Sequence, residues 1–148
     1  MNNWHYNCLL LFGFIEESEM DNILIVTHDE NLINFTMRDY IRLKFRFVHC
    51  SNIFQGLKRI AEEDIGFLIY DVTSSSLNIL QAIKMAKKLK PNLHIIIITD
   101  DESILRNKNL DLKIIDFIQF KPPEFDQLEQ NLYLYSTVWN KKKSKEKK

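Results

Sequence analysis

Glycine is scarce in this sequence, and where it occurs argues against a large class of nucleotide-binding sites. The chain of 148 residues has three glycines, Gly13, Gly56 and Gly66. Dinucleotide-binding and P-loop folds place glycines directly after the first strand, so that the backbone can approach phosphate. None follows Val26, the end of the first predicted strand. NAD, FAD and P-loop sites are therefore not expected.

Cysteines and long apolar runs are also few. The two cysteines, Cys8 and Cys50, fall in no CxxC or Cys/His pattern with zinc spacing. We expect both to be reduced and structural, in a cytoplasmic protein. No apolar run approaches the length that spans a membrane, so no membrane association is expected.

The net charge is zero, but it is unevenly distributed. Residues 141–148 hold six Lys and one Glu, which gives +5, whereas residues 1–140 hold 14 basic and 19 acidic residues, which gives −5. A mildly acidic body argues against direct nucleic-acid binding. We interpret the Lys-rich segment 141–148 as a disordered tail, the start of a linker, or a weak handle for anionic partners.

Residues 1–20 do not match the pattern of the rest of the chain and are interpreted as an N-terminal extension. The apolar run Cys8–Ile15 lacks the preceding positive charges and the small-residue cleavage site of a signal peptide. Two interpretations remain open: an added helix that packs on the domain, or an extension that precedes a natural start at Met20. The main domain is expected to cover residues 21–140.

From Ile23 onward, strand and helix patterns alternate. The predicted strands are Ile23–Val26, Phe45–Cys50, Phe67–Asp71, His94–Thr99 and Ile114–Phe120. Asp29 or Asn31 is predicted to cap a first helix that runs to about Leu43, and Ser51 or Asn52 a second helix that runs to about Glu63. Three further helices are predicted over about 77–90, 102–109 and 124–140. Five such β–α units with very apolar strands predict an α/β fold. We expect a (βα)5 three-layer sandwich with a five-stranded parallel sheet and flavodoxin-like strand order.

The stretch from Gly66 to Thr73 is the centre of this pattern, because four apolar residues lead directly into Asp71. The carboxyl ends of parallel strands meet at one edge of the sheet, where ligands bind in open α/β folds. That edge also receives Thr27, His28 and Asp29 after the first strand, Thr99 to Asp101 after the fourth, and Lys121 after the fifth. A carboxylate, a hydroxyl and an ammonium group there make a plausible phosphoryl site. In the simpler alternative, Asp71 only caps a loop.

With these residues in place, the sequence resembles the receiver domain of two-component response regulators over about residues 21–140. The resemblance rests on the five β–α units, on Asp71 after the third strand, on Thr99 after four isoleucines, and on Lys121-Pro122 after the fifth strand. It implies that Asp71 is the phosphoacceptor, that Thr99 is the switching hydroxyl and that Lys121 contacts the acceptor. It also implies that the Lys121–Pro122 bond is a candidate for the cis form.

The sequence departs from that family where a cation should bind. Receiver domains usually carry two acidic residues after the first strand, and the resemblance implies that these hold Mg²⁺. Here Thr27 and His28 occupy the two positions. Mg²⁺ prefers hard oxygen ligands, which puts this site in doubt and leaves Asp71 and Asp29 as its candidate ligands. Two further departures are the lack of a Met-Pro pair after Asp71 and the presence of Ile118 at the usual aromatic position.

Three functional hypotheses follow. The first is a non-enzymatic, atypical receiver that acts through a histidine kinase or another signalling protein, with phosphorylation at Asp71 and a homodimer contact over about residues 102–140. The second is a pseudo-receiver that is never phosphorylated and acts as a constitutive interaction domain. The third, ranked well below the others, is a small flavodoxin-like enzyme or ligand-binding protein.

Overall fold

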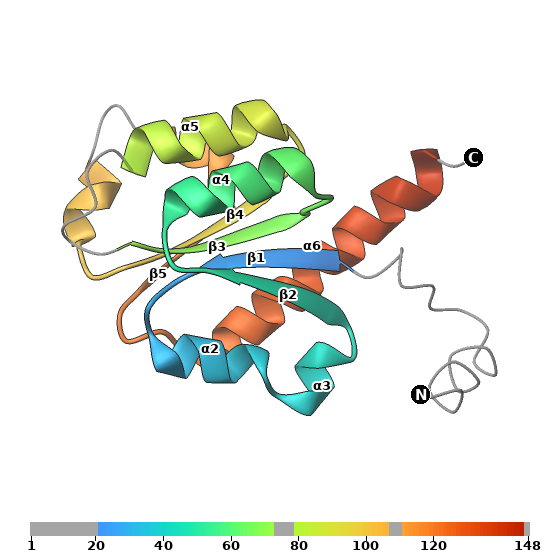
Figure 1. Cartoon of the computed structure of the whole chain (residues 1–148), viewed down its shortest axis with the longest axis horizontal. Coiled ribbons are helices and arrows are strands. Elements are labelled where there is room, and N and C mark those ends of the chain that lie inside the picture. Colours follow the sequence, from blue (N-terminus) through green and yellow to red (C-terminus); the bar gives the residue numbers. More distant parts are fainter. Residues whose placement is uncertain (1–20, 73–78, 107–110, 147–148) are drawn as a thin grey trace.

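The protein is a five-stranded parallel sheet between two layers of helices (Figure 1). The computed structural model describes residues 21–72, 79–106 and 111–146, with side chains described as far as residue 136. The strands are β1 (Asp21–Val26), β2 (Phe45–Cys50), β3 (Phe67–Val72), β4 (His94–Thr99) and β5 (Phe117–Phe120). The α-helices are α2 (Glu30–Thr36), α3 (Asp39–Arg42), α4 (Ile53–Glu62), α5 (Ile79–Leu89) and α6 (Phe125–Glu146), and two short 3-10 helices are η2 (Glu102–Arg106) and η3 (Leu112–Ile114).

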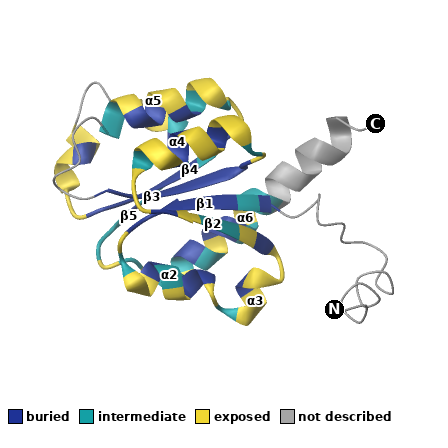
Figure 2. Cartoon of the chain, in the orientation of Figure 1, coloured by how far each residue is buried: buried dark blue, intermediate teal, exposed yellow. Residues whose placement is uncertain are grey.

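The strand order is β2-β1-β3-β4-β5, and every neighbouring pair is parallel. This is the flavodoxin-like order, so the predicted fold class is confirmed. The central strand β3 is buried along all six of its residues, and burial is concentrated in the sheet (Figure 2). Its apolar run from Phe67 to Tyr70 is typical of a parallel strand that is covered on both faces.

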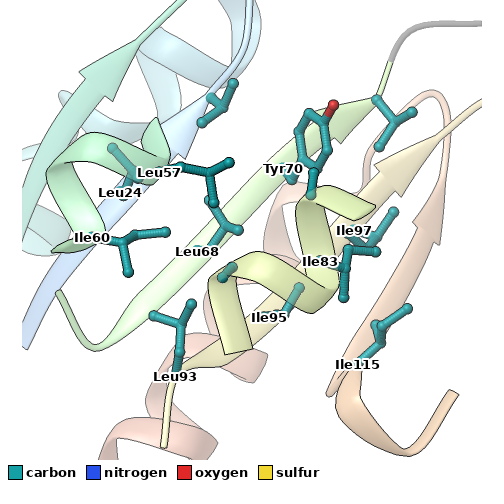
Figure 3. Packing of buried hydrophobic residues seen from close by; sticks show 14 of the residues in the cluster. Leu24, Leu57, Ile60, Leu68, Tyr70, Ile83, Leu93, Ile95, Ile97 and Ile115 are labelled. Atoms are coloured by element: carbon teal, nitrogen blue, oxygen red, sulfur yellow. The ribbon is translucent and has the colours of Figure 1, made fainter. Parts of the chain in front are cut away.

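Each face of the sheet has its own apolar core. Helices α4 and α5 cover one face, where Leu57, Ile60 and Ile83 pack against β-strand side chains such as Leu68 and Ile95 (Figure 3). Helices α2, α3 and α6 cover the other face (Figure 1). The residues of this second core include Leu32, Phe35, Ile41, Phe67, Ile96, Leu128 and Leu132. Alternate residues of each strand point to opposite faces, which is why both cores draw on the same strands.

The first predicted helix is interrupted, contrary to the prediction of one helix to about Leu43. Helix α2 ends at Thr36, and Arg38 takes an extended backbone with φ −63° and ψ 131° before α3 begins. There its guanidinium lies over the rings of Phe35 and Phe125, 5.3 Å and 5.6 Å from their centroids. This tertiary contact outweighs the local helical pattern.

The fifth strand is shorter than predicted. It begins at Phe117, whereas Ile114 belongs to the short helix η3, whose N-cap is Asp111. The carboxylate of Asp116 accepts a hydrogen bond from the Ile95 amide at 2.7 Å, and strand pairing starts at the next residue. The fourth predicted helix is the 3-10 helix η2, and the rest of its predicted range, 107–109, lies outside the described residues.

The last helix is longer than predicted, since α6 continues from Phe125 to Glu146 rather than ending near Asn140. Residues 141–146 are therefore helical, which corrects the interpretation of a disordered tail. The Lys121–Pro122 bond is cis, as the resemblance implied. In the part of the chain that the structure describes, no helix has the length and apolar character to cross a membrane.

Candidate functional site

Asp71 lies near the carboxyl end of the central strand, and its side chain is 3% exposed. Strands β1 and β4 flank β3, so residues at their ends lie beside it. A carboxylate that is withdrawn from water at this depth needs hydrogen-bonding or charged partners. Two side chains from the ends of other strands provide them.

The first partner is Lys121, which follows β5. Its Nζ lies 2.7 Å from Asp71 Oδ1, and the Lys side chain is 27% exposed. The backbone N–H of Lys121 donates to the carbonyl of Thr99 at 2.9 Å, which fixes the start of the turn. The ammonium thus reaches the carboxylate from two strands away and balances its charge.

The second partner is Thr27, which follows β1 and is buried. Thr27 Oγ1 lies 2.6 Å from Asp71 Oδ2. The amide of Asp29 donates to the same hydroxyl oxygen at 2.9 Å. Because an amide N–H is only a donor, the hydroxyl hydrogen of Thr27 is directed to Asp71. Both oxygens of Asp71 are therefore engaged, one by an ammonium and one by a hydroxyl.

The backbone of Thr27 is held on the side of β2. Its N–H donates to the carbonyl of Cys50 at 3.2 Å, and its carbonyl lies 2.9 Å from Nε2 of His49. The sequence interpretation assigned His49 no role. In the structure its ring fixes the residue that contacts Asp71, and no local pattern in the sequence announces this.

Asp29 does not reach Asp71 as a ligand partner but caps a helix. It is the N-cap of α2, and its Oδ1 accepts the amide of Asn31 at 2.9 Å. This confirms one of the two predicted caps. His28, between Thr27 and Asp29, is exposed.

The donor set does not fit Mg²⁺. Within residues 21–72, 79–106 and 111–136, no group of three His, Cys, Asp or Glu side chains is placed to hold a metal ion. Asp71 supplies a carboxylate, but Thr27 and Lys121 occupy its oxygens and Asp29 caps α2. A hydroxyl and an ammonium are poor substitutes for the charged oxygen ligands that Mg²⁺ prefers.

Thr99 lies at the end of β4, in register with Val72 of the neighbouring strand, and is buried. Its hydroxyl accepts the amide of Asp101 at 3.1 Å, and within the described part of the chain it makes no hydrogen bond to Asp71. Asp101 in turn accepts the amide of Ser103 at 2.9 Å, and hydrogen bonding from the Ser103 side chain and from this amide lowers the pKa of Asp101. The sequence placed Asp101 after the fourth strand at the edge of the sheet, but its contact with Thr99 was missed.

Comparisons with known proteins agree on the fold. No protein-family model matches the chain, and no curated protein matches it by sequence. Among solved structures, a CheY-like response regulator receiver domain from Methanospirillum hungatei has a TM-score of 0.69 at 21% identity, and the match covers 83% of this chain and 98% of that one. A response regulator from Thermotoga maritima has a TM-score of 0.66 at 14% identity, with 80% and 98% covered. An adenylate cyclase from Rhodopirellula baltica has a TM-score of 0.70 at 18% identity, with 86% and 96% covered.

The fold of this chain is therefore that of receiver domains, at identities too low to carry over more than the fold. Functional residues have to be argued from the site itself. In that site Asp71, Thr27 and Lys121 come together from three strand ends, and Thr99 lies beside them.

Proposed function

We propose that this chain is an atypical receiver-like signalling module that acts through protein partners, with Asp71 as a slow phosphoacceptor. The observation that carries the proposal is the ion pair of buried Asp71 with partly exposed Lys121, with Nζ 2.7 Å from Oδ1, at the ligand-binding edge of a receiver fold. An ordinary solvated carboxylate needs no such pairing. A buried carboxylate can act as a nucleophile, and an ammonium beside it can stabilise the phosphoryl group that it accepts.

The reaction expected at this site is acyl-phosphate formation. With acetyl phosphate as donor, a carboxylate oxygen of Asp71 attacks the phosphorus, the bond from phosphorus to the bridging oxygen breaks, and acetate departs. With a phosphohistidine as donor, the phosphorus–nitrogen bond breaks instead and the imidazole departs. The ammonium of Lys121 stabilises the charge on the phosphoryl oxygens. The hydroxyl of Thr27 is hydrogen-bonded to the other carboxylate oxygen and must be displaced or reoriented if that oxygen is to react.

Slow transfer follows from the donor set. Phosphoryl transfer is catalysed largely by positioning and by neutralising charge on the equatorial oxygens. Here the ammonium of Lys121 is the positive charge that touches Asp71 in the described structure. Since the site lacks the carboxylates that would hold a cation, we expect acceptance to be slow and insensitive to Mg²⁺.

The output is expected to pass through protein contact, because no described residue of the site is placed to act on a further substrate. The partners that fit are a histidine kinase or another signalling protein. We place a homodimer contact over about residues 102–140, which correspond to η2, η3, β5 and α6. In this proposal the module is not itself an enzyme, acts in the cytoplasm and binds no nucleic acid.

A second candidate is a pseudo-receiver that is never phosphorylated. The observation that favours it is the hydrogen bond from Thr27 to Asp71 Oδ2 at 2.6 Å, which engages the second carboxylate oxygen beside the ion pair of Oδ1 with Lys121. Such a module presents one constitutive surface to its partner. A flavodoxin-like ligand-binding role is not favoured by any contact at this site.

Intact-mass measurement after incubation with acetyl phosphate separates the two candidates. Native protein, Asp71→Asn and Thr27→Val are compared, the last because it frees one carboxylate oxygen without adding a charge. A phosphoryl adduct on the native chain that is absent from Asp71→Asn supports the receiver. An adduct on Thr27→Val but not on the native chain, or on neither, selects the pseudo-receiver. An equal adduct on Asp71→Asn refutes Asp71 as the acceptor.

A further inference from the structure

The outer edge of β2 carries a groove that combines apolar and basic side chains. Strand β2 ends the sheet, so in the described part of the chain only β1 pairs with it. The groove has a volume of about 650 Å³. Its lining comes from α2, the residue after it, α3 and β2: Ile33, Thr36, Met37, Arg42, Phe45, Arg46, Phe47 and His49.

The apolar part of this groove is exposed to an unusual extent. Met37 is 58% exposed, and Phe47 in the middle of β2 is only half-buried. An edge strand with exposed apolar side chains and an open row of backbone groups invites pairing with another chain segment. Natural proteins commonly cover such an edge.

The basic part lacks acidic partners. Within the described residues, neither Arg42 nor Arg46 forms an ion pair, and both are exposed. Lys44, between them, lies over the ring of Tyr133 with Nζ 5.2 Å from its centroid. The start of β2 therefore carries positive charge beside apolar surface, which is complementary to an acidic and apolar segment.

We propose that residues 8–19 of this chain occupy the groove. The run Cys8–Ile15 is apolar apart from Gly13, and Glu16, Glu17 and Glu19 follow it. This order matches the groove, because the apolar residues can contact Met37 and Phe47 while the three carboxylates can pair with Arg42 and Arg46. The chain enters the fold at Asp21, which is paired in register with Phe45 at the start of β2.

The connection is short enough to determine the direction of the segment. Adjacent strands lie roughly 4.8 Å apart, so the outer lane of β2 is about 10 Å from β1. Residues 16–20 span up to about 17 Å when extended, which is enough to cross the end of β2. Because the segment must finish beside Phe45, its residues 8–15 run antiparallel to β2 and its glutamates lie near Arg46.

Because residues 16–20 connect the segment to β1, even a weak contact is sufficient to keep the segment in the groove. A short linker gives an effective concentration on the order of millimolar, so the segment occupies the groove even where the free peptide would bind poorly. Occupation covers an edge that would otherwise pair between molecules. This inference does not depend on phosphorylation of Asp71.

Paramagnetic broadening in the full chain tests the inference. A nitroxide spin label is attached to Cys8 in a Cys50→Ala background, in which Cys8 is the remaining cysteine. The amide resonances of β2 and Met37 should lose most of their intensity, while those of β5, at the far edge of the sheet, keep theirs. Equal intensities throughout, or broadening confined to other elements, would overturn the proposal.

Charge reversal provides the matched controls. Arg42→Glu with Arg46→Glu should restore the β2 intensities, and adding Glu16→Lys, Glu17→Lys and Glu19→Lys to that variant should broaden them again. Lys58→Glu with Lys84→Glu, an equal charge change on α4 and α5, should leave the broadening unchanged. If broadening arises only when labelled chain is mixed with unlabelled isotope-enriched chain, a second copy fills the groove and the intramolecular proposal is wrong.

Discussion

Thr27 donates its hydroxyl hydrogen to Asp71 across 2.6 Å, at the position where receiver domains usually carry an acidic residue. An acidic residue at this position would repel Asp71 and attract a cation. Thr27 instead donates a hydrogen bond directly to the Asp71 carboxylate. Lys121 completes the set from the other side at 2.7 Å. The function proposed for the chain depends on this closed arrangement, and the following predictions test its parts.

Replacing Thr27 with Val should destabilise the fold. The change keeps the shape but leaves Asp71 Oδ2 and the Asp29 amide without their partner. An unsatisfied buried polar group costs roughly 1–3 kcal/mol in the free energy of unfolding. Urea denaturation measures the loss, and Thr36→Val is the control because its hydroxyl bonds only the local Ile33 carbonyl. A Thr27→Val loss no greater than that of the control would contradict the contact.

Lys121→Met should leave the Asp71 carboxylate uncompensated. Breaking a fully buried ion pair costs about 3–5 kcal/mol, and the partial exposure of Lys121 reduces that figure. Adding Asp71→Asn to Lys121→Met should recover part of the loss, since the remaining group is then neutral. Urea midpoints of the two single variants and the double variant give the coupling, with Lys113→Met on exposed η3 as the control. Additive losses would show that the pair is not coupled.

The acidic pair can be restored by Thr27→Asp with His28→Asp. The double variant brings two carboxylates to the strand end beside Asp71, which together supply hard oxygen ligands for Mg²⁺. We expect Mg²⁺ to raise the unfolding temperature of the variant and to leave that of the native chain unchanged, because a ligand that binds the folded state stabilises it. Ca²⁺-free buffer and a K⁺ control of equal ionic strength separate binding from screening. A native chain stabilised as strongly by Mg²⁺ would refute the donor-set argument.

Acid stability should depend in part on Asp116, at the opposite end of the sheet. Burial would raise the pKa of Asp116, but hydrogen bonding from His94 and the Ile95 amide outweighs it, so the pKa lies below its usual 3.8. A carboxyl whose folded pKa is depressed contributes stability above its unfolded pKa, and that contribution is lost as the pH falls through the folded value. Asp116→Asn should therefore flatten the fall in urea midpoint below pH 3.8. If the urea midpoint of Asp116→Asn fell with pH as steeply as that of the native chain, the loss of stability in acid would have to come from other carboxyl groups.

Gly56 in α4 should not tolerate alanine, although alanine favours helices. A Cβ at this position would lie 3.0 Å from Val26 Cγ2 and 3.2 Å from Leu24 Cδ2, and both side chains are buried in β1. Overpacking of a filled core costs typically 1–3 kcal/mol, which exceeds the gain of about 1 kcal/mol in helix propensity. Chemical denaturation should show a net loss for Gly56→Ala. Ala61→Gly, at an exposed position of α4, measures the contribution of helix propensity alone. If Gly56→Ala were more stable than the native chain, α4 would have to shift outward to make room for the Cβ.

The parts of the fold that were predicted correctly are those fixed by local pattern. Strands β2 and β4 were predicted to the residue, β4 from its run of isoleucines and β2 from alternation that places Phe45, Phe47 and His49 on one face. The break after α2 and the late start of β5 were missed, because Arg38 and Asp116 take their conformations from partners that are distant in the sequence.

The candidate site likewise has features that the sequence predicts and features that it does not. The meeting of Asp71 and Lys121 follows from the common edge of parallel strand ends and is therefore predictable from the sequence. The role of Thr27 was not inferred, since the sequence shows only a hydroxyl where an acid is usual. The direction of its hydrogen depends on the Asp29 amide, which no pattern reveals. Thr99 lies at the predicted strand end, but its hydroxyl contacts Asp101 rather than Asp71.

The rate of adduct formation on Asp71, measured by intact mass over a range of Mg²⁺ concentrations, tests the central claim most directly. The native chain and the Thr27→Asp, His28→Asp variant are compared with acetyl phosphate as donor, and Asp71→Asn sets the background. The account predicts a slow native rate that does not change with Mg²⁺ and a variant rate that rises with it to a plateau. A native rate that climbs and saturates with Mg²⁺ would contradict the account, because it would require a cation site that Thr27 and Lys121 leave no room for.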